Sequence, residues 1–190
     1  MTTILLTGKN GQVGFELQRS LAPLGAIVAV GSSDVDFANT EAIRALIRRI
    51  KPDVIVNPAA YTAVDKAEAE PELANAINAE APAIIGQEAD RLGALVVHYS
   101  TDYVFDGCKP GAYVESDATA PQGAYGRSKC DGERALQAAT ERNMILRTSW
   151  VVGAHGNNFA KTMLRLASER DTLAVVADQW GAPTSATLLA

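Results

Sequence analysis

The stretch TILLTGKNGQVG (residues 3–14) joins an apolar, β-rich segment to a polar turn that contains three glycines. Gly8, Gly11 and Gly14 are spaced G-x-x-G-x-x-G, and apolar residues then recur at helical spacing from residue 12 to residue 25. A strand that ends in a glycine turn and leads into a helix is a recurrent unit of α/β folds. The stretch therefore predicts a βα unit at the start of the chain.

The same alternation continues along the chain. Apolar runs predict further strands at residues 26–30, 53–57, 94–100, 144–150 and 173–177. Helical patterns lie between them at residues 39–50, 71–91, 125–141 and 158–169. Strands that are apolar throughout and alternate with amphipathic helices are typical of a parallel sheet covered on both faces. The sequence predicts a doubly wound, Rossmann-like α/β fold, with residues 1–190 as one NAD(P)-binding domain.

Composition is that of an ordinary globular protein and argues against some partners. The chain has 190 residues and a net charge of −5 at pH 7. Such a chain lacks the basic face that replaces counterions on nucleic acid, so we expect no nucleic-acid partner. Its only cysteines, Cys108 and Cys130, fit neither a disulfide framework nor a zinc motif. No leader or membrane-length apolar run is visible, so we expect a cytoplasmic protein without a membrane partner.

The glycine turn is suited to a dinucleotide. Gly8 permits the tight turn, Gly11 lets the backbone approach a diphosphate, and Gly14 lets the helix pack closely against the strand. The N-terminus of the following helix offers free N–H groups and a partial positive charge to the phosphates. In the first βα turn of an α/β chain, this spacing predicts dinucleotide binding.

The end of the second strand indicates which dinucleotide is bound. A carboxylate at this point accepts hydrogen bonds from the ribose hydroxyls and disfavours a 2′-phosphate. Here the strand ends Val30-Gly31-Ser32-Ser33, with no acid at its tip. Ser32 and Ser33 can hydrogen-bond a 2′-phosphate, so we expect NADPH as the cofactor. Asp34 can still turn toward the ribose and no arginine is nearby, which leaves NADH as an alternative.

Asp36 and Phe37 follow this turn and are suited to the adenine. The carboxylate can accept a hydrogen bond from the exocyclic amine, and the ring can pack on the base. The alternative is that Asp36 is a solvated turn residue and Phe37 a core residue.

A possible catalytic pair lies in AYGRSKC (residues 124–130), where Tyr125 and Lys129 are four residues apart. In a helix this spacing puts both side chains on one face. Alone, the pair fits a solvated helix face as well as an active site. The glycine turn upstream and Thr101, which follows the strand at residues 94–100, favour the active site.

Together these features resemble the extended short-chain dehydrogenase/reductase superfamily. Within it, the chain is similar to the dTDP-4-dehydrorhamnose reductases. The similar stretches follow the family's order over essentially the whole chain: GKNGQVGFELQ, DVIVNPAAYTAVDKAE, HYSTDYVFDG, YGRSK, LRTSWV, GNNFAKTMLRLA and DQWGAPT.

The resemblance implies NAD(P)H-dependent reduction of the 4-keto group of dTDP-4-dehydro-L-rhamnose, a dTDP-sugar, in polysaccharide biosynthesis. It implies Thr101, Tyr125 and Lys129 as catalytic residues. Substrate contacts are expected from Thr101, Asp102 and Trp150. Cofactor contacts are expected, beyond the glycines and serines above, from Gln12, Val13, Asp36, Phe37, Ala59, Ala60, Tyr61, Tyr99, Tyr125 and Lys129.

The chain departs from the family at two places. Val30-Gly31 stands where relatives often have an acid, and Tyr61 stands where they commonly have His. Relatives use Mg²⁺ and can dimerise, which leaves both open for this chain. However, Asp65, Glu68 and Glu70 are scattered along a segment expected to be exposed, so no dedicated metal site is predicted.

In the reduction implied by the resemblance, Tyr125 would act as general acid and Thr101 would hold the ketone oxygen. Phenolate chemistry near neutrality requires a pKa roughly three units below the usual 10, or about 4 kcal/mol. A cation about 4 Å away, at an effective dielectric constant near 20, supplies energy of that order. We therefore expect Lys129 to lower the pKa of Tyr125 and to bridge the cofactor ribose.

Two other functions share parts of this pattern. A nucleotide-sugar dehydratase or epimerase has the same fold, glycine turn and Tyr/Lys pair. Dehydration needs a further acid–base pair beside the threonine, but Asp102 is followed by Tyr103. A non-catalytic NAD(P)-binding regulatory subunit often lacks a member of the triad, and here Thr101, Tyr125 and Lys129 are all present.

Three expectations concern the remaining residues. In the family a smaller region after GAPT helps enclose the sugar nucleotide, and the chain reaches about that point. We expect this chain to bind NADPH and to be weak or inactive towards the sugar nucleotide, unless that region is supplied elsewhere. His98, in a predicted strand, is expected to be a packed core residue, and His155 a surface residue.

Overall fold

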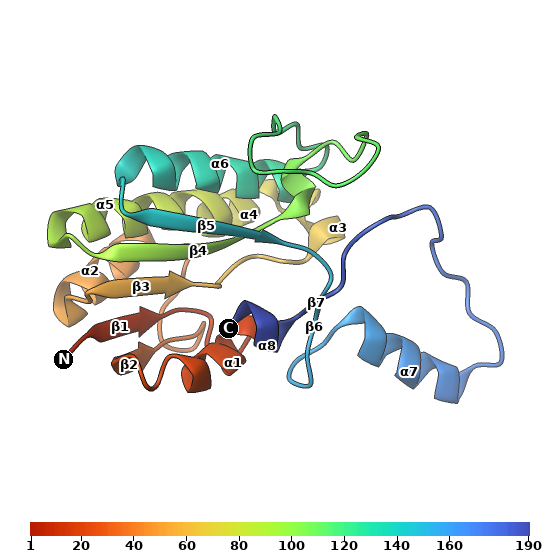
Figure 1. Cartoon of the computed structure of the whole chain (residues 1–190), viewed down its shortest axis with the longest axis horizontal. Helices are drawn as coiled ribbons and strands as arrows, with labels where there is room; N and C mark the ends of the chain where they lie inside the picture. Colours follow the sequence, from red (N-terminus) through yellow and green to blue (C-terminus); the bar gives the residue numbers. More distant parts are fainter.

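A computed structural model describes residues 1–190. Its main sheet has five parallel strands in the order β2-β1-β3-β4-β5 (Figure 1). The strands are β1 (Thr3–Leu6), β2 (Ala26–Ala29), β3 (Val54–Asn57), β4 (Leu95–Thr101) and β5 (Asn143–Thr148). Because β1 lies between β2 and β3, the order reverses between β1 and β3, where open α/β sheets bind their ligands.

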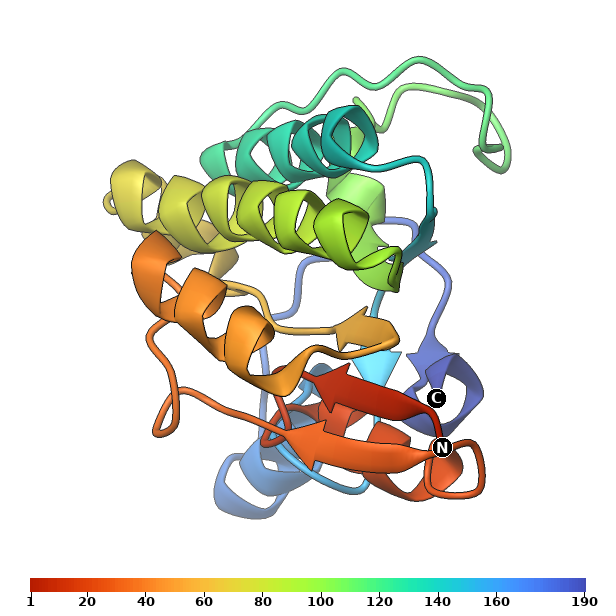
Figure 2. The same ribbon diagram turned by 90° about the vertical axis from the view of Figure 1, so that its left-hand side faces the viewer.

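Helices cover both faces of the sheet. The helix α1 (Gln12–Ser20) follows the glycine turn and lies on one face. Three helices lie next to one another on the other face (Figure 2). They are α2 (Thr40–Ile50), α5 (Ala81–Leu92) and α6 (Ala124–Ala139). This arrangement confirms the predicted doubly wound parallel fold.

The core follows the alternation of side chains along the strands. Leu5, Ile55 and Val96 belong to the larger core cluster with residues of α2 and α5. Ile4 and Leu6, on the opposite side of β1, pack in a second cluster with residues of α1. Burying each of these side chains stabilises the fold by about 1.5–3 kcal/mol. Both faces are therefore closed by packing, and only the ends of the strands are open to ligands.

The helix predicted at residues 71–91 contains a π-helical segment. The predicted helix is made of α4 (Pro71–Asn75), the π-helical segment η1 (Ala76–Glu80) and α5. Within η1, the Asn78 side chain donates to the backbone oxygen of Tyr61 at 3.0 Å and accepts from its N–H at 2.9 Å. Short π segments are frequent at functional sites, since one extra residue per turn redirects a side chain.

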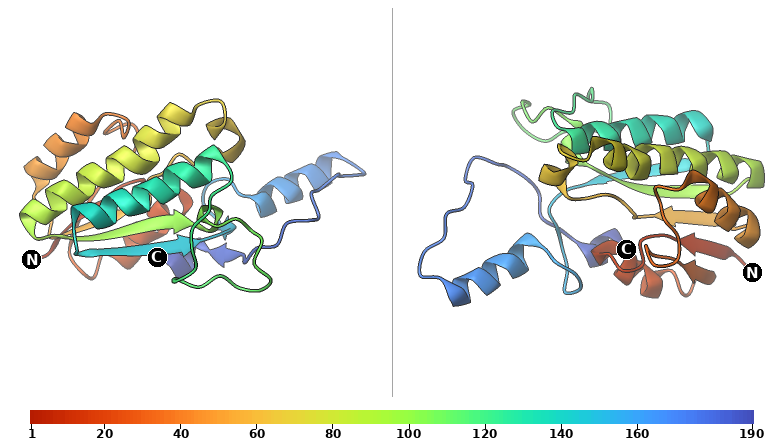
Figure 3. Two further views of the ribbon diagram at one scale, coloured as in Figure 1. Left: turned by 90° about the horizontal axis from the view of Figure 1, so that it is seen from above. Right: turned by 180° about the vertical axis from the view of Figure 1, so that it is seen from behind.

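The predicted strand at residues 173–177 is wrong. Val175 is 49% exposed and Val176 67% exposed, and no strand forms there. An apolar run forms a strand only where another strand offers backbone partners, and this segment projects away from the sheet (Figures 1 and 3).

The remaining elements are short or lie beside the sheet. Two short helices, α3 (Val64–Ala67) and η2 (Asp102–Val104), follow β3 and β4. A two-residue parallel pair joins β6 (Val151–Val152) to β7 (Thr184–Ser185). The helix α7 (Phe159–Glu169) has no buried residue, and α8 (Ala186–Leu189) packs against α1. None of the helices combines the length and apolarity needed to cross a membrane.

Candidate active site

A cleft of about 810 Å³ lies at the carboxyl ends of the strands. It is lined by residues from the first βα turn, the ends of β2 to β5 and the start of α6. All but two of the predicted site residues line it: Gly8, Gly11, Gln12, Val13, Gly14, Ser32, Asp36, Phe37, Ala59, Ala60, Tyr99, Thr101, Asp102, Tyr125, Lys129 and Trp150. Ser33 and Tyr61 do not line it.

The glycine turn has the geometry that its spacing predicts. Gly8 has φ +60, in the left-handed region that favours glycine. A Cβ at Gly14 would lie 2.1 Å from the backbone oxygen of Gly8, so no side chain fits there. Gly11 precedes α1 and offers no side chain to cap it, so the first N–H groups of the helix have no capping side chain. The turn therefore fits a diphosphate group.

Two buried hydroxyls on the opposite wall support a polar ligand. Ser100 Oγ on β4 and Thr148 Oγ1 on β5 have no hydrogen-bond partner, and both residues line the cleft. A buried hydroxyl without a partner costs free energy. A ligand with polar groups would satisfy them, which is a second reason that the cleft fits a nucleotide cofactor and a sugar.

Tyr125 at the start of α6 is buried, and burial raises the pKa of its phenol to about 12. The nearby hydroxyl of Thr101 lowers this pKa in part, and the Asp102 carboxylate raises it further. Thr101 Oγ1 itself donates to Asp102 Oδ1 at 3.1 Å. The Tyr103 ring packs edge-on against Tyr125, with 5.5 Å between centroids. The phenol is therefore protonated at neutral pH and lies beside two polar side chains.

Lys129 follows Tyr125 by one helical turn but does not lower its pKa as we expected. Its ammonium donates to the backbone oxygen of Tyr99 at 2.7 Å and lies 3.3 Å from Nε2 of His98. Burial lowers the pKa of Lys129 to about 8. The expected lowering of the Tyr125 pKa is wrong for this structure. Burial disfavours both the phenolate of Tyr125 and the ammonium of Lys129, and the ammonium is held by Tyr99 and His98.

An ion pair near the end of β2 was not predicted. Lys9 Nζ lies 2.6 Å from Asp34 Oδ2, and this carboxylate also accepts from the Gly31 N–H at 2.8 Å. Ser32 lines the cleft, whereas Ser33, Lys9 and Asp34 do not. Lys9, directly after Gly8 in the glycine turn, could have indicated this ion pair, because the turn and the end of β2 lie side by side in this fold.

The predicted adenine contacts have more than one role. Phe37 lines the cleft and packs against the larger core cluster. Asp36 lines the cleft and accepts from the Ala38 N–H at 2.9 Å, as in a turn. The structure is thus compatible both with contacts to an adenine and with the alternative, in which Asp36 is a turn residue and Phe37 a core residue.

Ala59 and Ala60 line the cleft after β3, but the Tyr61 side chain turns away from it. The Tyr61 hydroxyl donates to Glu70 at 2.6 Å. This carboxylate holds the phenol outside the cleft, so the structure does not place Tyr61 with the other predicted cofactor contacts.

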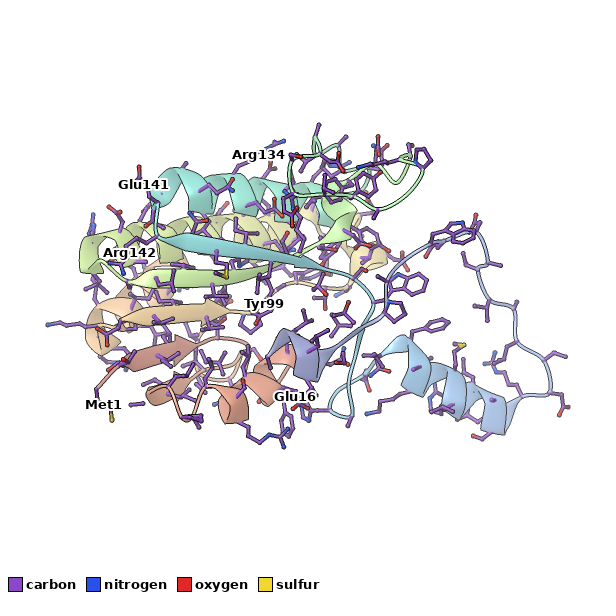
Figure 4. The ribbon with its side chains drawn as sticks, in the orientation of Figure 1. Met1, Glu16, Tyr99, Arg134, Glu141 and Arg142 are labelled. Atoms are coloured by element: carbon purple, nitrogen blue, oxygen red, sulfur yellow. The ribbon has the colours of Figure 1, made fainter.

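Tyr99 and Trp150 line the cleft with different constraints. The Tyr99 hydroxyl donates to the backbone oxygen of Leu189 at 2.5 Å, which fixes it between the sheet and α8 (Figure 4). Trp150 is 48% exposed and has φ 46, a left-handed backbone that is uncommon for a bulky residue. Gly181 packs on the indole, where a Cβ would lie 2.5 Å from the ring. Strain of this kind is often found at ligand sites.

Several lining residues were missed by the sequence analysis. They are Asn10, Gly31, Val35, Pro58, Thr62, Ile77, Ser100, Tyr103, Thr148, Ser149, Val151, Gly156 and Asn157. Of the residues in the 153–158 loop, Asn158 Nδ2 donates to Gln12 Oε1 at 2.9 Å and so closes the loop over the glycine turn. Nothing local in the sequence indicates this contact, because 146 residues separate its partners.

The acidic segment near residue 68 has a structural role. Lys66 pairs with Glu70 at 2.8 Å, as expected for this spacing, and Glu68 Oε1 accepts from the Ala124 N–H at 2.6 Å at the start of α6. In the chain, no three His, Cys, Asp or Glu side chains are arranged to hold a metal ion.

Known proteins share this architecture and sequence. A dTDP-4-dehydrorhamnose reductase of Escherichia coli (strain K12) is 58% identical over 191 residues, covering 98% of this chain and 64% of the relative. A solved dTDP-4-dehydrorhamnose reductase from Clostridium acetobutylicum superposes with a TM-score of 0.93 at 42% identity, covering 97% of this chain and 66% of that one. One from Bacillus anthracis, in complex with NADP, gives 0.92 at 41% identity, covering the same shares.

The chain thus spans 64% of the length of the curated relative from Escherichia coli. A family model described as the RmlD substrate binding domain matches residues 1–190. Because this match extends over the entire chain, the protein belongs to the RmlD substrate binding domain family.

Proposed function

We propose that the chain forms the cofactor-binding and proton-donating part of an NADPH-dependent reductase that converts dTDP-4-dehydro-L-rhamnose to dTDP-L-rhamnose. One observation carries the proposal. The cleft has a glycine turn suited to a diphosphate on one wall and Thr101, Tyr125 and Lys129 together on the other. Relatives with the same fold are dTDP-4-dehydrorhamnose reductases, and one was solved with NADP.

Tyr125 is the proposed proton donor. A bound NADPH supplies a hydride to the 4-keto carbon, which leaves an alkoxide on the sugar. Its conjugate acid has a pKa near that of bulk water, roughly 16. The phenol, with a pKa of about 12, is protonated at neutral pH and gives its proton to this oxygen favourably. The phenolate then recovers a proton from solvent, which completes the reduction.

Thr101 is placed to hold the substrate oxygen. Its hydroxyl lies near Tyr125 and donates to Asp102 at 3.1 Å. A hydroxyl rotates freely, so the same donor can turn from the carboxylate to the carbonyl of a bound sugar. Asp102 is half-buried, and burial raises the pKa of its carboxyl. We assign Asp102 and Trp150, both lining the cleft, to the sugar nucleotide.

NADPH is the proposed cofactor because the end of β2 has a cation and hydroxyls near it. Ser32 lines the cleft, and the Lys9 ammonium lies 2.6 Å from Asp34 beside it. A 2′-phosphate would attract Lys9 and be repelled by Asp34. The pair itself is neutral, so the proposal of NADPH rests on the Ser32 hydroxyl and on Lys9 turning to the phosphate, and NADH is the alternative.

Replacement of Tyr125 by Phe tests the assignment. NADPH binding to the chain, followed by nicotinamide fluorescence, is expected to change little, because the phenol oxygen is the only atom removed. NADPH oxidation by the whole protein with dTDP-4-dehydro-L-rhamnose is expected to fall roughly a hundredfold to ten-thousandfold, the usual contribution of a general acid. Tyr113→Phe is the matched control, since its hydroxyl donates to Asp106 outside the cleft.

Each outcome distinguishes between functions. Binding of NADPH without any reduction of the sugar by the unsubstituted protein would instead favour the non-catalytic regulatory subunit. Loss of water from a dTDP-sugar without net NADPH oxidation would favour a dehydratase. Full activity of Tyr125→Phe would show that another group donates the proton.

A further inference from the structure

A chain of buried hydrogen bonds runs through the sheet to Lys129. Thr7 Oγ1 lies 2.6 Å from Asn57 Oδ1, and the Asn57 amide nitrogen lies 3.0 Å from Nδ1 of His98. Nε2 of His98 lies 3.3 Å from Nζ of Lys129. His98 is 0% exposed and Lys129 1% exposed. Side chains from the carboxyl ends of β1 and β3 and from the middle of β4 are thus linked to the helix α6.

The Lys129 ammonium has few other partners. Besides His98, it donates to the backbone oxygen of Tyr99 at 2.7 Å. Glu133, one turn further along α6, binds Arg147 of β5 at 2.6 Å and is not an ion-pair partner of Lys129. A buried cation needs acceptors for its hydrogens, because water does not supply them. Nε2 of His98 is therefore one of two acceptors that hold Lys129.

The position of the imidazole proton follows from this geometry. An ammonium only donates hydrogen bonds, so Nε2 must accept, and a neutral ring then carries its proton on Nδ1. That N–H needs an acceptor. In the structure Asn57 accepts from the Thr7 hydroxyl through Oδ1 and presents its amide nitrogen to Nδ1, so this tautomer requires a half-turn of the amide. After the half-turn the amide oxygen accepts from Nδ1 and the amide nitrogen faces Thr7 Oγ1.

The same chain reaches the glycine turn. Thr7 immediately precedes Gly8, and its hydroxyl accepts from the Ala59 N–H at 3.3 Å. Gly8, Ala59 and Lys129 all line the cleft. The buried chain therefore connects the wall that fits a diphosphate with the wall that carries Lys129.

We propose that His98 is a positioning residue that holds the Lys129 ammonium at the cleft by accepting its hydrogen bond at Nε2. The inference rests on the proposed function for the role of Lys129, while the tautomer itself does not. His98 does not touch the substrate oxygen and transfers no proton in the reaction. Its effect is on where the cation lies and how readily it stays charged.

The surroundings favour a neutral ring. A second cation beside Lys129 is unfavourable in a space without water, and burial together with Lys129 lowers the pKa of His98 well below its usual value. The other titratable group that acts on the pair is Glu133 on α6, whose carboxylate raises the pKa of Lys129 in part. Arg147 neutralises Glu133 from β5.

Nitrogen NMR of the unsubstituted chain tests the tautomer directly. Long-range correlations of the ¹⁵N-labelled imidazole distinguish a protonated from an unprotonated ring nitrogen. We expect His98 at neutral pH with a protonated Nδ1 and an unprotonated Nε2. A protonated Nε2, or an imidazolium, would overturn the proposal, because neither can accept from Lys129.

Two substitutions test the consequence. His98→Leu removes the acceptor at similar volume, whereas the longer amide of His98→Gln keeps an oxygen within reach of Nζ. For His98→Leu we expect NADPH affinity or turnover to fall about tenfold to a hundredfold, as for a lost hydrogen bond to a charged group. We also expect the alkaline limb of the pH profile to move to lower pH, because an ammonium that loses an acceptor gives up its proton more readily. His98→Gln should restore both to within about threefold.

Cys130→Ala is the matched control. This residue is buried beside Lys129 on α6 but contacts Thr119 and the Phe105 cluster, outside the hydrogen-bond chain. Unchanged turnover, affinity and pH profile in His98→Leu would overturn the proposal while the proposed reduction stands. Absence of reduction by the unsubstituted protein would instead remove the proposed function, and the NMR result would still decide the tautomer.

Discussion

The Lys129 ammonium donates to the backbone oxygen of Tyr99 at 2.7 Å and is almost completely buried. Its pKa is lowered from 10.5 to about 8, mainly by burial. The folded chain therefore holds a cation at a cost in stability, at a place where the proposed reaction needs one. This relationship gives the first prediction.

Lys129→Met should remove a pH dependence of stability. Between about pH 8 and pH 10.5 the unfolded chain binds the proton of Lys129 more tightly than the folded chain. The free energy of unfolding therefore rises with pH in this window, by about 2 kcal/mol between pH 7 and about pH 9.5. Urea unfolding at both values should show this rise in the unsubstituted chain and not in Lys129→Met.

The control for this experiment is Lys66→Met, which removes an ammonium whose side chain is 65% exposed. It should leave the rise between the two pH values unchanged. A rise of equal size in Lys129→Met and the unsubstituted chain would mean that Lys129 is not the buried cation that the structure shows.

The glycines of the turn should separate folding from cofactor binding. A Cβ at Gly14 would lie 2.1 Å from the Gly8 oxygen, a backbone atom that cannot move cheaply. Gly14→Ala should therefore lower the free energy of unfolding by about 1–3 kcal/mol. A Cβ at Gly11 meets the same oxygen at 3.4 Å, so Gly11→Ala should fold normally but bind NADPH at least tenfold more weakly. Thermal unfolding and fluorescence titration measure the two effects.

Equal NADPH affinity in Gly11→Ala and the unsubstituted chain would place the diphosphate elsewhere. Gly107→Ala is a useful comparison for backbone strain alone. Gly107 has φ +75, its Cβ would meet nothing within 4 Å, and it lies outside the cleft, so this variant should lose stability but keep its NADPH affinity.

The Lys9–Asp34 pair should set the preference between the two cofactors. Asp34→Asn keeps an acceptor for the Gly31 N–H and removes the charge that competes for Lys9. NADPH affinity should rise about fivefold to tenfold, because one negative charge near the 2′-phosphate is removed. NADH lacks this phosphate, so its affinity should change little. Lys9→Gln should lower NADPH affinity by a similar factor. Calorimetric titration of both cofactors checks the result, and equal shifts for both would contradict it.

A buried carboxylate should stabilise the helical layer. Glu88 on α5 is 2% exposed and binds Arg44 at 2.7 Å and Arg48 at 2.8 Å, both from α2. These arginines hold the pKa of Glu88 at about 2. We expect Glu88→Gln to lower the free energy of unfolding by about 2 kcal/mol at pH 7, less than for a fully buried pair because Arg48 is half exposed.

The sign of the pH dependence follows from the lowered pKa. The stabilisation is complete above the ordinary pKa of 4.5 and is lost as the pH falls toward 2. The difference between Glu88→Gln and the unsubstituted chain should therefore shrink on acidification. Glu41→Gln, whose carboxylate is 80% exposed beside Arg44, should change stability by less than about 0.5 kcal/mol.

Local patterns in the sequence were enough to predict the parallel sheet, the glycine turn and most of the cleft. Gly8, Gly11 and Gly14 act within one turn of chain, and Tyr125 and Lys129 within one turn of helix. Where the partner is close in sequence, spacing decides geometry. The prediction of a strand at residues 173–177 was wrong because a strand needs a partner strand. The spacing of apolar residues does not show whether that partner is present.

What the sequence alone determined is therefore the fold, the family and which side chains gather at the cleft. Only the tertiary structure decided what each polar group bonds to. Lys129 contacts Tyr99 and His98 of β4, Lys9 contacts Asp34 after β2, and Tyr61 turns to Glu70. The physical reason is that a buried donor takes the acceptor that packing brings nearest. For Lys129 and Tyr125 it is burial in the folded chain that shifts the pKa most.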